Sequence, residues 1–230
     1  MAKEHSELVK EHFEMKYYDY DELIQKLIPK YTEMHNLVVQ LFDFPTDKKM
    51  SILDLGVGTG QTALSLLQKF PNATLDGIDI SPKMIEQAKI RLKNFLDRIT
   101  FSEKDIKNLK ISKLYDACVA VLSIHHLNEN QKPKLFRKIF DNLKVDGIFL
   151  IGDIIKFDSE KVTKEKEEEW RNFLIKNLGE KEGQYWFENY QEEDLPSSVS
   201  NQLEWLKQAG FKEVKCIWEY MNYAVFFGRK

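Results

Sequence analysis

The chain has 230 residues and a formal net charge of −3 at pH 7, with 43% hydrophobic and 31% charged residues. This composition supports one packed domain, excludes disorder over the whole chain, and provides no global basic field for nucleic acid. The first residues lack the apolar core of a signal peptide, and the longest apolar runs are too short to cross a bilayer. We therefore expect a cytoplasmic protein that does not span a membrane.

The first expected elements are helices, which form an N-terminal cap up to about residue 45. Apolar residues recur there at helical spacing, and Pro29 interrupts the pattern. After the cap, apolar segments alternate with amphipathic ones. The expected strands cover 52–55, 73–79, 99–105, 115–122 and 146–153, and the expected helices between them cover 61–70, 82–95 and 131–143. This order predicts an α/β fold with a doubly wound, mostly parallel sheet.

The alternation stops after the fifth expected strand. A long charged helix is expected over 159–180, followed by an aromatic group in which we expect about half of the residues to be core and the others to line an acceptor pocket. The group comprises Trp170, Tyr185, Trp186, Phe187 and Tyr190. A helix closed by Gly210 and two antiparallel strands over 213–220 and 223–230 follow. The single domain of residues 1–230 then divides into the cap (1–45), a core (46–156), a helical insertion (157–197) and a terminal helix with a β-hairpin (198–230).

The first expected strand ends in the pattern D-x-G-x-G-x-G, formed by Asp54, Gly56, Gly58 and Gly60. Ligands of open α/β sheets bind beyond the carboxyl ends of the strands, so this loop should approach a ligand with its backbone. Gln61 stands where a dinucleotide fingerprint has its third glycine, and the Lys-Ser/Thr of a phosphate-binding loop is missing. We expect a ligand without a pyrophosphate; a tight strand-to-helix turn is the structural alternative.

Acidic residues are expected at the ends of the next two strands. Asp79 can accept hydrogen bonds from both hydroxyls of a ribose. Asp105 can accept from an adenine amino group, with Ile106 and Met84 against the faces of the ring. The structural alternatives are a helix N-terminus for Asp79 and an ordinary turn for Asp105.

The fourth expected strand leads into "VLSIHHL", which places Leu122, Ser123, His125 and His126 at the floor of the crevice. One imidazole can act as a general base or orient a substrate. Alternatively, the pair is a structural loop element with one ring packed inward. No carboxylate or cysteine lies at ligand spacing from the pair, so we expect no metal site.

The segments "LDLGVGTG", "GIDIS", "EKDI" and "AVLSIHHL", in this order and spacing, resemble the class I S-adenosylmethionine-dependent methyltransferases. The resemblance implies a Rossmann-like sheet of seven strands, the last antiparallel, and methyl transfer from S-adenosyl-L-methionine. It also implies an N-terminal tyrosine that covers the cofactor. The expected cofactor-binding residues are Asp54, Gly56, Gly58, Thr59, Gly60, Asp79, Ile80, Met84, Asp105, Ile106, Leu122, Ser123 and Tyr18.

The segments "YDELIQKLIPKYTEMH" and "QLEWLKQAGF" resemble the carboxy-S-adenosylmethionine synthase group and related uncharacterised methyltransferases. Those synthases make a carboxylated cofactor for tRNA wobble-uridine modification, and hold the added carboxylate with an arginine at the position of Trp205. Since that arginine is missing, we expect methyl transfer to a small-molecule acceptor beneath the cap and the insertion. The alternatives are the synthase or another tRNA-modifying role, and a cofactor-binding protein without turnover. The sequence leaves open whether the chain forms a homodimer.

Overall fold

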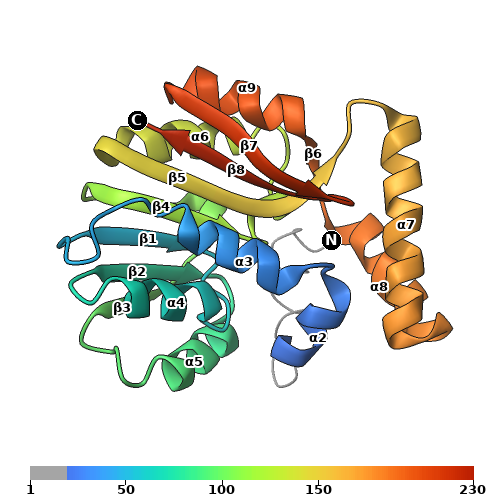
Figure 1. The fold of residues 1–230 in the computed structure, drawn as a ribbon, viewed down its shortest axis with the longest axis horizontal. Helices are drawn as coiled ribbons and strands as arrows, with labels where there is room; N and C mark the ends of the chain where they lie inside the picture. Colours follow the sequence, from blue (N-terminus) through green and yellow to red (C-terminus); the bar gives the residue numbers. More distant parts are fainter. Residues whose placement is uncertain (1–19) are drawn as a thin grey trace, which may run out of the picture.

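One mixed sheet forms the centre of the molecule (Figure 1). The computed structural model describes residues 20–230, and its long strands follow the order β3-β2-β1-β4-β5-β8-β7. These strands are β1 (Ser51–Leu55), β2 (Thr74–Asp79), β3 (Ile99–Glu103), β4 (Tyr115–Val121), β5 (Leu143–Lys156), β7 (Glu213–Tyr220) and β8 (Tyr223–Arg229). Strands β1 to β5 pair in parallel, while β8 is antiparallel to both β5 and β7. The predicted Rossmann-like sheet, with its antiparallel pair at one edge, is confirmed.

The part of the chain that the structure describes has one strand more than the expected seven. Strand β6 (Ser197–Ser198) pairs in parallel with Ile155 and Lys156 at the end of β5. Two residues are too few to show an alternating apolar pattern, so the sequence contains no signal for this strand. It attaches the end of the insertion to the sheet.

Helices cover both faces of the sheet, as a doubly wound fold requires. They are α2 (Tyr20–Leu27), α3 (Tyr31–Gln40), α4 (Gln61–Lys69), α5 (Pro82–Arg91), α6 (Lys132–Asp141) and α9 (Val199–Ala209). Helices α2 to α5 share one apolar core with the sheet, and α6 and α9 share the other. Strand β4 lies between the two cores and is buried along its whole length. None of the helices in residues 20–230 combines the length and the apolar character of a membrane span.

Several helix ends follow the local signals in the sequence. Pro29 lies between α2 and α3, and the Ser81 side chain caps α5 by accepting from the Met84 amide nitrogen at 3.3 Å. Gly210 closes α9 with a φ of 111°. Helix α5 ends at Arg91, four residues before the expected end, and a turn follows it.

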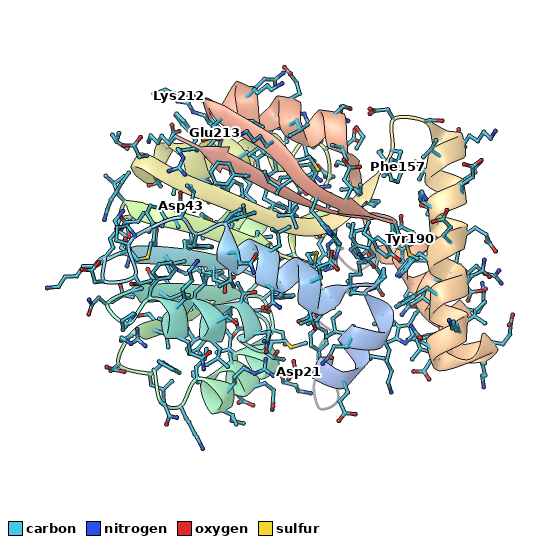
Figure 2. The ribbon with its side chains drawn as sticks, in the orientation of Figure 1. Asp21, Asp43, Phe157, Tyr190, Lys212 and Glu213 are labelled. Atoms are coloured by element: carbon cyan, nitrogen blue, oxygen red, sulfur yellow. The ribbon has the colours of Figure 1, made fainter. Side chains whose placement is uncertain are left out.

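The insertion is a pair of helices, α7 (Glu160–Leu178) and α8 (Glu180–Glu193), at one side of the molecule (Figure 1). The sequence indicated α7 but only an aromatic group in place of α8. Trp170 of α7 packs edge-on against Tyr190 of α8, with ring centroids 5.0 Å apart, and lies 6.0 Å from Phe187. Figure 2 shows Tyr190 on the side of α7 that faces the sheet. Packing against α7, rather than its own charged sequence, stabilises α8.

Gly183 of α8 lies where the two helices of the insertion approach each other closely. A Cβ at this position would lie 2.6 Å from the Ile175 amide nitrogen and 2.8 Å from the Leu174 carbonyl carbon. Because both are backbone atoms, Gly183→Ala should lower the free energy of unfolding by roughly 1–3 kcal/mol. Thermal unfolding measures the effect. A rise in Tm, which is the usual result of Gly→Ala inside a helix, would contradict the close packing.

Candidate functional site

The glycine loop joins β1 to α4, and its three glycines have different surroundings. Gly56, Gly58 and Gly60 all have positive φ angles, of 75°, 53° and 85°. A Cβ on Gly56 would collide with Ser123, and one on Gly60 would lie 2.8 Å from a methyl group of Leu92. At Gly58 a Cβ would meet nothing closer than 4.0 Å. Two of the glycines are therefore required by contacts within the protein, and Gly58 alone of the three faces open space.

A cavity of about 250 Å³, here called the first cavity, lies beyond the carboxyl ends of β1, β2 and β4. Most of the expected cofactor residues line it: Gly56, Gly58, Thr59, Asp79, Ile80, Met84, Asp105, Ile106, Leu122 and Ser123. The lining does not include Asp54, which is buried beneath the loop, or Gly60, which packs against α5. Tyr18 lies outside the described residues. The fold thus brings together most of the expected cofactor-binding residues, which are far apart in the sequence.

Asp79 connects the glycine loop to the end of β2. Its Oδ2 accepts a hydrogen bond from the Gly58 amide at 2.8 Å, and its Oδ1 accepts from the Ser81 amide at 2.9 Å. Burial raises the pKa of Asp79, and these amide hydrogen bonds act in the opposite direction. The Ile80 amide is a third donor to this carboxylate, and the three amides leave at least one of its lone pairs to accept from a ligand. Asp79 therefore fixes the loop and also faces the first cavity.

Asp105 follows β3 rather than ending it, because the strand stops at Glu103. Its Oδ1 accepts from the Lys107 amide at 2.8 Å and so caps the short 3-10 turn Ile106–Asn108. Asp105 therefore caps the turn and also lines the first cavity.

Asp54 is the most unusual acid of the site. It is 1% exposed, and its Oδ2 has no hydrogen-bond partner. Burial, with a further contribution from the charge of Asp79, raises the pKa of Asp54 to about 8. A buried carboxyl without a counter-charge favours its neutral form.

Helix α2 reaches over the first cavity and is attached to the glycine loop. Thr59 Oγ1 donates to Asp21 Oδ1 at 2.7 Å, and Arg91 Nη1 donates to Thr59 Oγ1 at 2.7 Å. Arg91 of α5 also forms an ion pair with Asp21 of α2, which Figure 2 labels. Tyr20, the residue before Asp21, lines the first cavity. Thr59, expected to face the cofactor, thus also binds the cap.

A second cavity of about 100 Å³ adjoins the first and shares Tyr20, Leu122 and His126 with it. The remaining lining is mostly apolar and aromatic and comes from the cap, the insertion and the sheet. It comprises Leu23, Ile24, Leu27, Ile28, His125, Ile154, Trp170, Trp186, Asn189, Tyr190, Glu193, Asp194 and Tyr223. Trp170 Nε1 donates to the Leu27 carbonyl oxygen at 2.8 Å, which joins the insertion to α2 across this cavity.

The two adjacent histidines occupy different positions. His125 packs inward and lines the second cavity alone, while His126 lines both. The His125 Nδ1 contacts a carboxylate oxygen of Asp153, whose Oδ2 accepts from the amides of Ile124 and His125 at 2.8 and 3.0 Å. Burial lowers the pKa of His125, but the charges of Asp153 and Asp194 outweigh it, so that the pKa is raised. His126 is therefore placed to contact groups bound in either cavity. His125 is placed instead to hold the loop that carries His126.

Asp194, at the end of α8, is the functional candidate that sequence reasoning missed. Its Oδ1 lies 3.4 Å from His126 Nδ1 and 3.6 Å from His125 Nε2. No local sequence pattern indicates this contact, because it forms only when the insertion folds back and places Asp194 beside the two histidines. Oxygen and nitrogen atoms of these three residues lie within 4.8 Å of one another. The expectation of no metal site rested on the lack of a nearby carboxylate, and the fold supplies one; the trio offers three ligands, one fewer than a structural zinc site uses.

The comparisons with known proteins agree on the family. A model described as a methyltransferase domain matches residues 52–147. A carboxy-S-adenosyl-L-methionine synthase of Nautilia profundicola is 30% identical over 217 residues, which is 92% of this chain and 90% of the relative. The synthase of Campylobacter hominis is 27% identical over the same shares. The chain belongs to the class I S-adenosylmethionine-dependent methyltransferases. It is an enzyme of that family, whose cofactor is S-adenosyl-L-methionine.

Solved methyltransferases share the fold at low sequence identity. Phosphoethanolamine N-methyltransferase 2 of Haemonchus contortus, solved with S-adenosyl-L-methionine, has a TM-score of 0.72 and 16% identity, covering all of this chain and 60% of its own. Human N-acetylserotonin methyltransferase, also solved with this cofactor, has a TM-score of 0.58 and 19% identity, over 85% and 51% of the two chains. This methyltransferase thus spans between half and two thirds of those chains.

Trp205, the position at which the carboxy-cofactor synthases are expected to carry an arginine, lies on α9. It packs in the apolar core between α9 and the sheet. Within residues 20–230, neither cavity has a lining residue from α9.

We expect Gly58→Val to abolish binding of S-adenosylhomocysteine, lowering the affinity at least roughly 100-fold. The branched side chain would enter the open space of the first cavity, and φ at this position strains any L residue. Isothermal titration measures the affinity. Gly152→Ala is the matched control, since its Cβ would meet Val38 and Met34 at ordinary contact distances. Normal binding by a folded Gly58→Val variant would contradict the assignment.

Asp54→Asn should stabilise the protein at neutral pH. Because the pKa is raised on folding, protonation favours the native state at low pH, and this advantage disappears as the pH rises from about 4 to about 8. The variant should gain on the order of 1–3 kcal/mol over the wild type across that range. Chemical denaturation at several pH values measures the difference. Asp47→Asn, at an exposed position, is the control, and parallel curves for Asp54→Asn and wild type would contradict the expectation.

Proposed function

We propose that this methyltransferase transfers a methyl group from S-adenosyl-L-methionine to a small-molecule acceptor bound in the second cavity. The observation that carries the proposal is the junction of the two cavities at Tyr20, Leu122 and His126. An in-line displacement at an activated sulfonium carbon requires mainly alignment of the reactants and exclusion of water. A cofactor cavity that adjoins a second, mostly apolar cavity suits both requirements.

The residues of the first cavity suit the proposed cofactor. Gly58 leaves room for a bound group against the loop, and Asp79 presents carboxylate oxygens that can accept from ribose hydroxyls. Asp105 is placed to accept from an adenine amino group, with Met84 and Ile106 on the faces of the ring. Gly56 and Gly60 shape the loop in this proposal, and Asp54, whose raised pKa favours the neutral carboxyl, is buried next to it.

A small acceptor suits the second cavity better than a polynucleotide does. Its walls come from α2, α7 and α8, and they are mostly apolar and aromatic. Enclosed apolar pockets with a few polar groups are typical of small-molecule sites. A nucleic acid would instead need a basic groove, and the chain has a net charge of −3.

The second candidate is synthesis of carboxy-S-adenosylmethionine, with a role in tRNA modification. It is favoured by the identity of 30% over 92% of the chain to a protein of that name. Two features weigh against it. Trp205 stands in place of the arginine, and among residues 20–230 the second cavity has no lysine or arginine in its lining. A carboxylate enclosed there without a cation would be unfavourable.

Mass analysis of the small molecules released from the denatured, purified protein separates the two candidates. We expect S-adenosylmethionine or its demethylated product. Gly58→Val, purified in the same way, is the control for carry-over and should release neither. A carboxylated cofactor in the wild-type sample, missing from the variant, would replace the proposed function by the second candidate.

A further inference from the structure

We infer that the acceptor is a small amine, held with its nitrogen beside Asp194 and His126 and its apolar body among the aromatic walls of the second cavity. This inference rests on the proposed function and names the substrate class of the same site. It follows from three properties of the second cavity: its walls, the sign of its charges, and the fixed position of one carboxylate.

The apolar and aromatic walls of the second cavity favour an acceptor with an apolar body. Trp170, Tyr190 and Tyr223 are buried and form edge-on ring contacts, with Trp170 at the centre of the group. Leu23 and Ile24 of α2 add aliphatic surface to the lining. Aromatic faces also attract cations through their quadrupole, so these walls suit an ammonium as well as a hydrocarbon.

The charged side chains at the polar end are acidic, apart from His125, whose pKa is raised by the charges of Asp153 and Asp194 beside it. Glu193 and Asp194 line the second cavity together with the two imidazoles, and no lysine or arginine of the described chain does so. The nearby cation, Lys132, is directed elsewhere, because its Nζ donates to Ser197 Oγ at 2.7 Å and also binds the Leu195 carbonyl oxygen. A carboxylate or phosphate acceptor would face two acidic groups at low dielectric, whereas an ammonium would be attracted.

The Asp194 carboxylate is held in a defined place. The next residue, Leu195, donates its amide to the His125 carbonyl oxygen at 2.8 Å, and Lys132 binds the Leu195 carbonyl. Asp153 does not compete for an acceptor, because its two oxygens already accept from His125 and from the amides of Ile124 and Ile154. We assign the acceptor nitrogen to Asp194 because this carboxylate is fixed beside both imidazoles.

The same residues account for the proton that an amine must lose before it can react. His126, which lies at the junction of the cavities and 3.4 Å from Asp194, accepts a proton from the ammonium. The neutral nitrogen attacks the methyl carbon, the carbon–sulfur bond breaks, and its electron pair stays on sulfur. The products are a methylated ammonium, a neutral thioether and an imidazolium that returns its proton to water.

Binding of three matched probes tests the charge preference. We propose to titrate benzylamine, benzyl alcohol and benzoate into the protein saturated with S-adenosylhomocysteine, using isothermal titration. Benzylamine should bind at least about 10-fold more tightly than either analogue. Tighter binding of benzoate or benzyl alcohol by the wild-type protein would overturn the inference, whatever any variant shows.

Asp194→Asn tests the residue. It should weaken benzylamine binding about 10-fold and leave the affinity for S-adenosylhomocysteine unchanged. Glu192→Gln, exposed on the same helix and outside the cavity lining, is the matched control and should retain both affinities. Unchanged benzylamine binding in a folded Asp194→Asn variant would overturn the assignment.

Two further results distinguish a failure of the amine inference from a failure of the proposed function. If the wild-type protein fails to bind S-adenosylhomocysteine, the proposed function itself fails. If it binds the cofactor product but contains a stoichiometric metal whose removal abolishes benzylamine binding, then His125, His126 and Asp194 are metal ligands, and the amine inference is overturned alone. Elemental analysis before and after treatment with a chelator provides that measurement.

Discussion

The close approach of Ser123 to Gly56 is the contact on which both cavities depend. Ser123 Oγ donates to the Leu55 carbonyl oxygen at 2.7 Å, and its side chain occupies the space that a Cβ on Gly56 would need. The preceding residue, Leu122, lies in the left-handed region at a φ of 53° and lines both cavities. Such a conformation persists in a non-glycine residue when the surroundings enforce it. The contact brings the end of β4, with its histidines, against the glycine loop.

Helix α2 contacts both the glycine loop and the insertion. At one end Asp21 binds Thr59 and Arg91, and at the other the Leu27 carbonyl accepts from Trp170. One short helix therefore connects the loop of the first cavity to the wall of the second. The loop of the first cavity and the wall of the second are thus joined through contacts of α2 that neither the core nor the insertion makes alone.

The sequence predicted those features that depend on local chemistry. Pro29, Ser81 and Gly210 mark helix ends through fixed dihedral angles or side-chain caps, and the apolar run of β4 indicates burial on both faces. The missed features depend on contacts between distant segments. Helix α8 is stabilised by α7, β6 has only two residues, and Asp194 reaches the histidines because Leu195 binds the backbone of His125. Gly56 and Gly60 were placed correctly in the loop, but their partners Ser123 and Leu92 could not be read from the chain.

The charge of the second cavity bears on both candidate functions at once. The core of this fold is shared by many chemistries, so selectivity has to come from the parts added to it. Here the insertion adds Glu193 and Asp194, whose negative charge lies next to the junction where the methyl group is proposed to be transferred. A carboxylated methyl group would bring a third negative charge to that place, while an amine would bring a positive one. The same acids that favour an amine acceptor therefore disfavour the carboxylated cofactor, and Trp205, packed in the opposite core, offers no charge to reverse the balance.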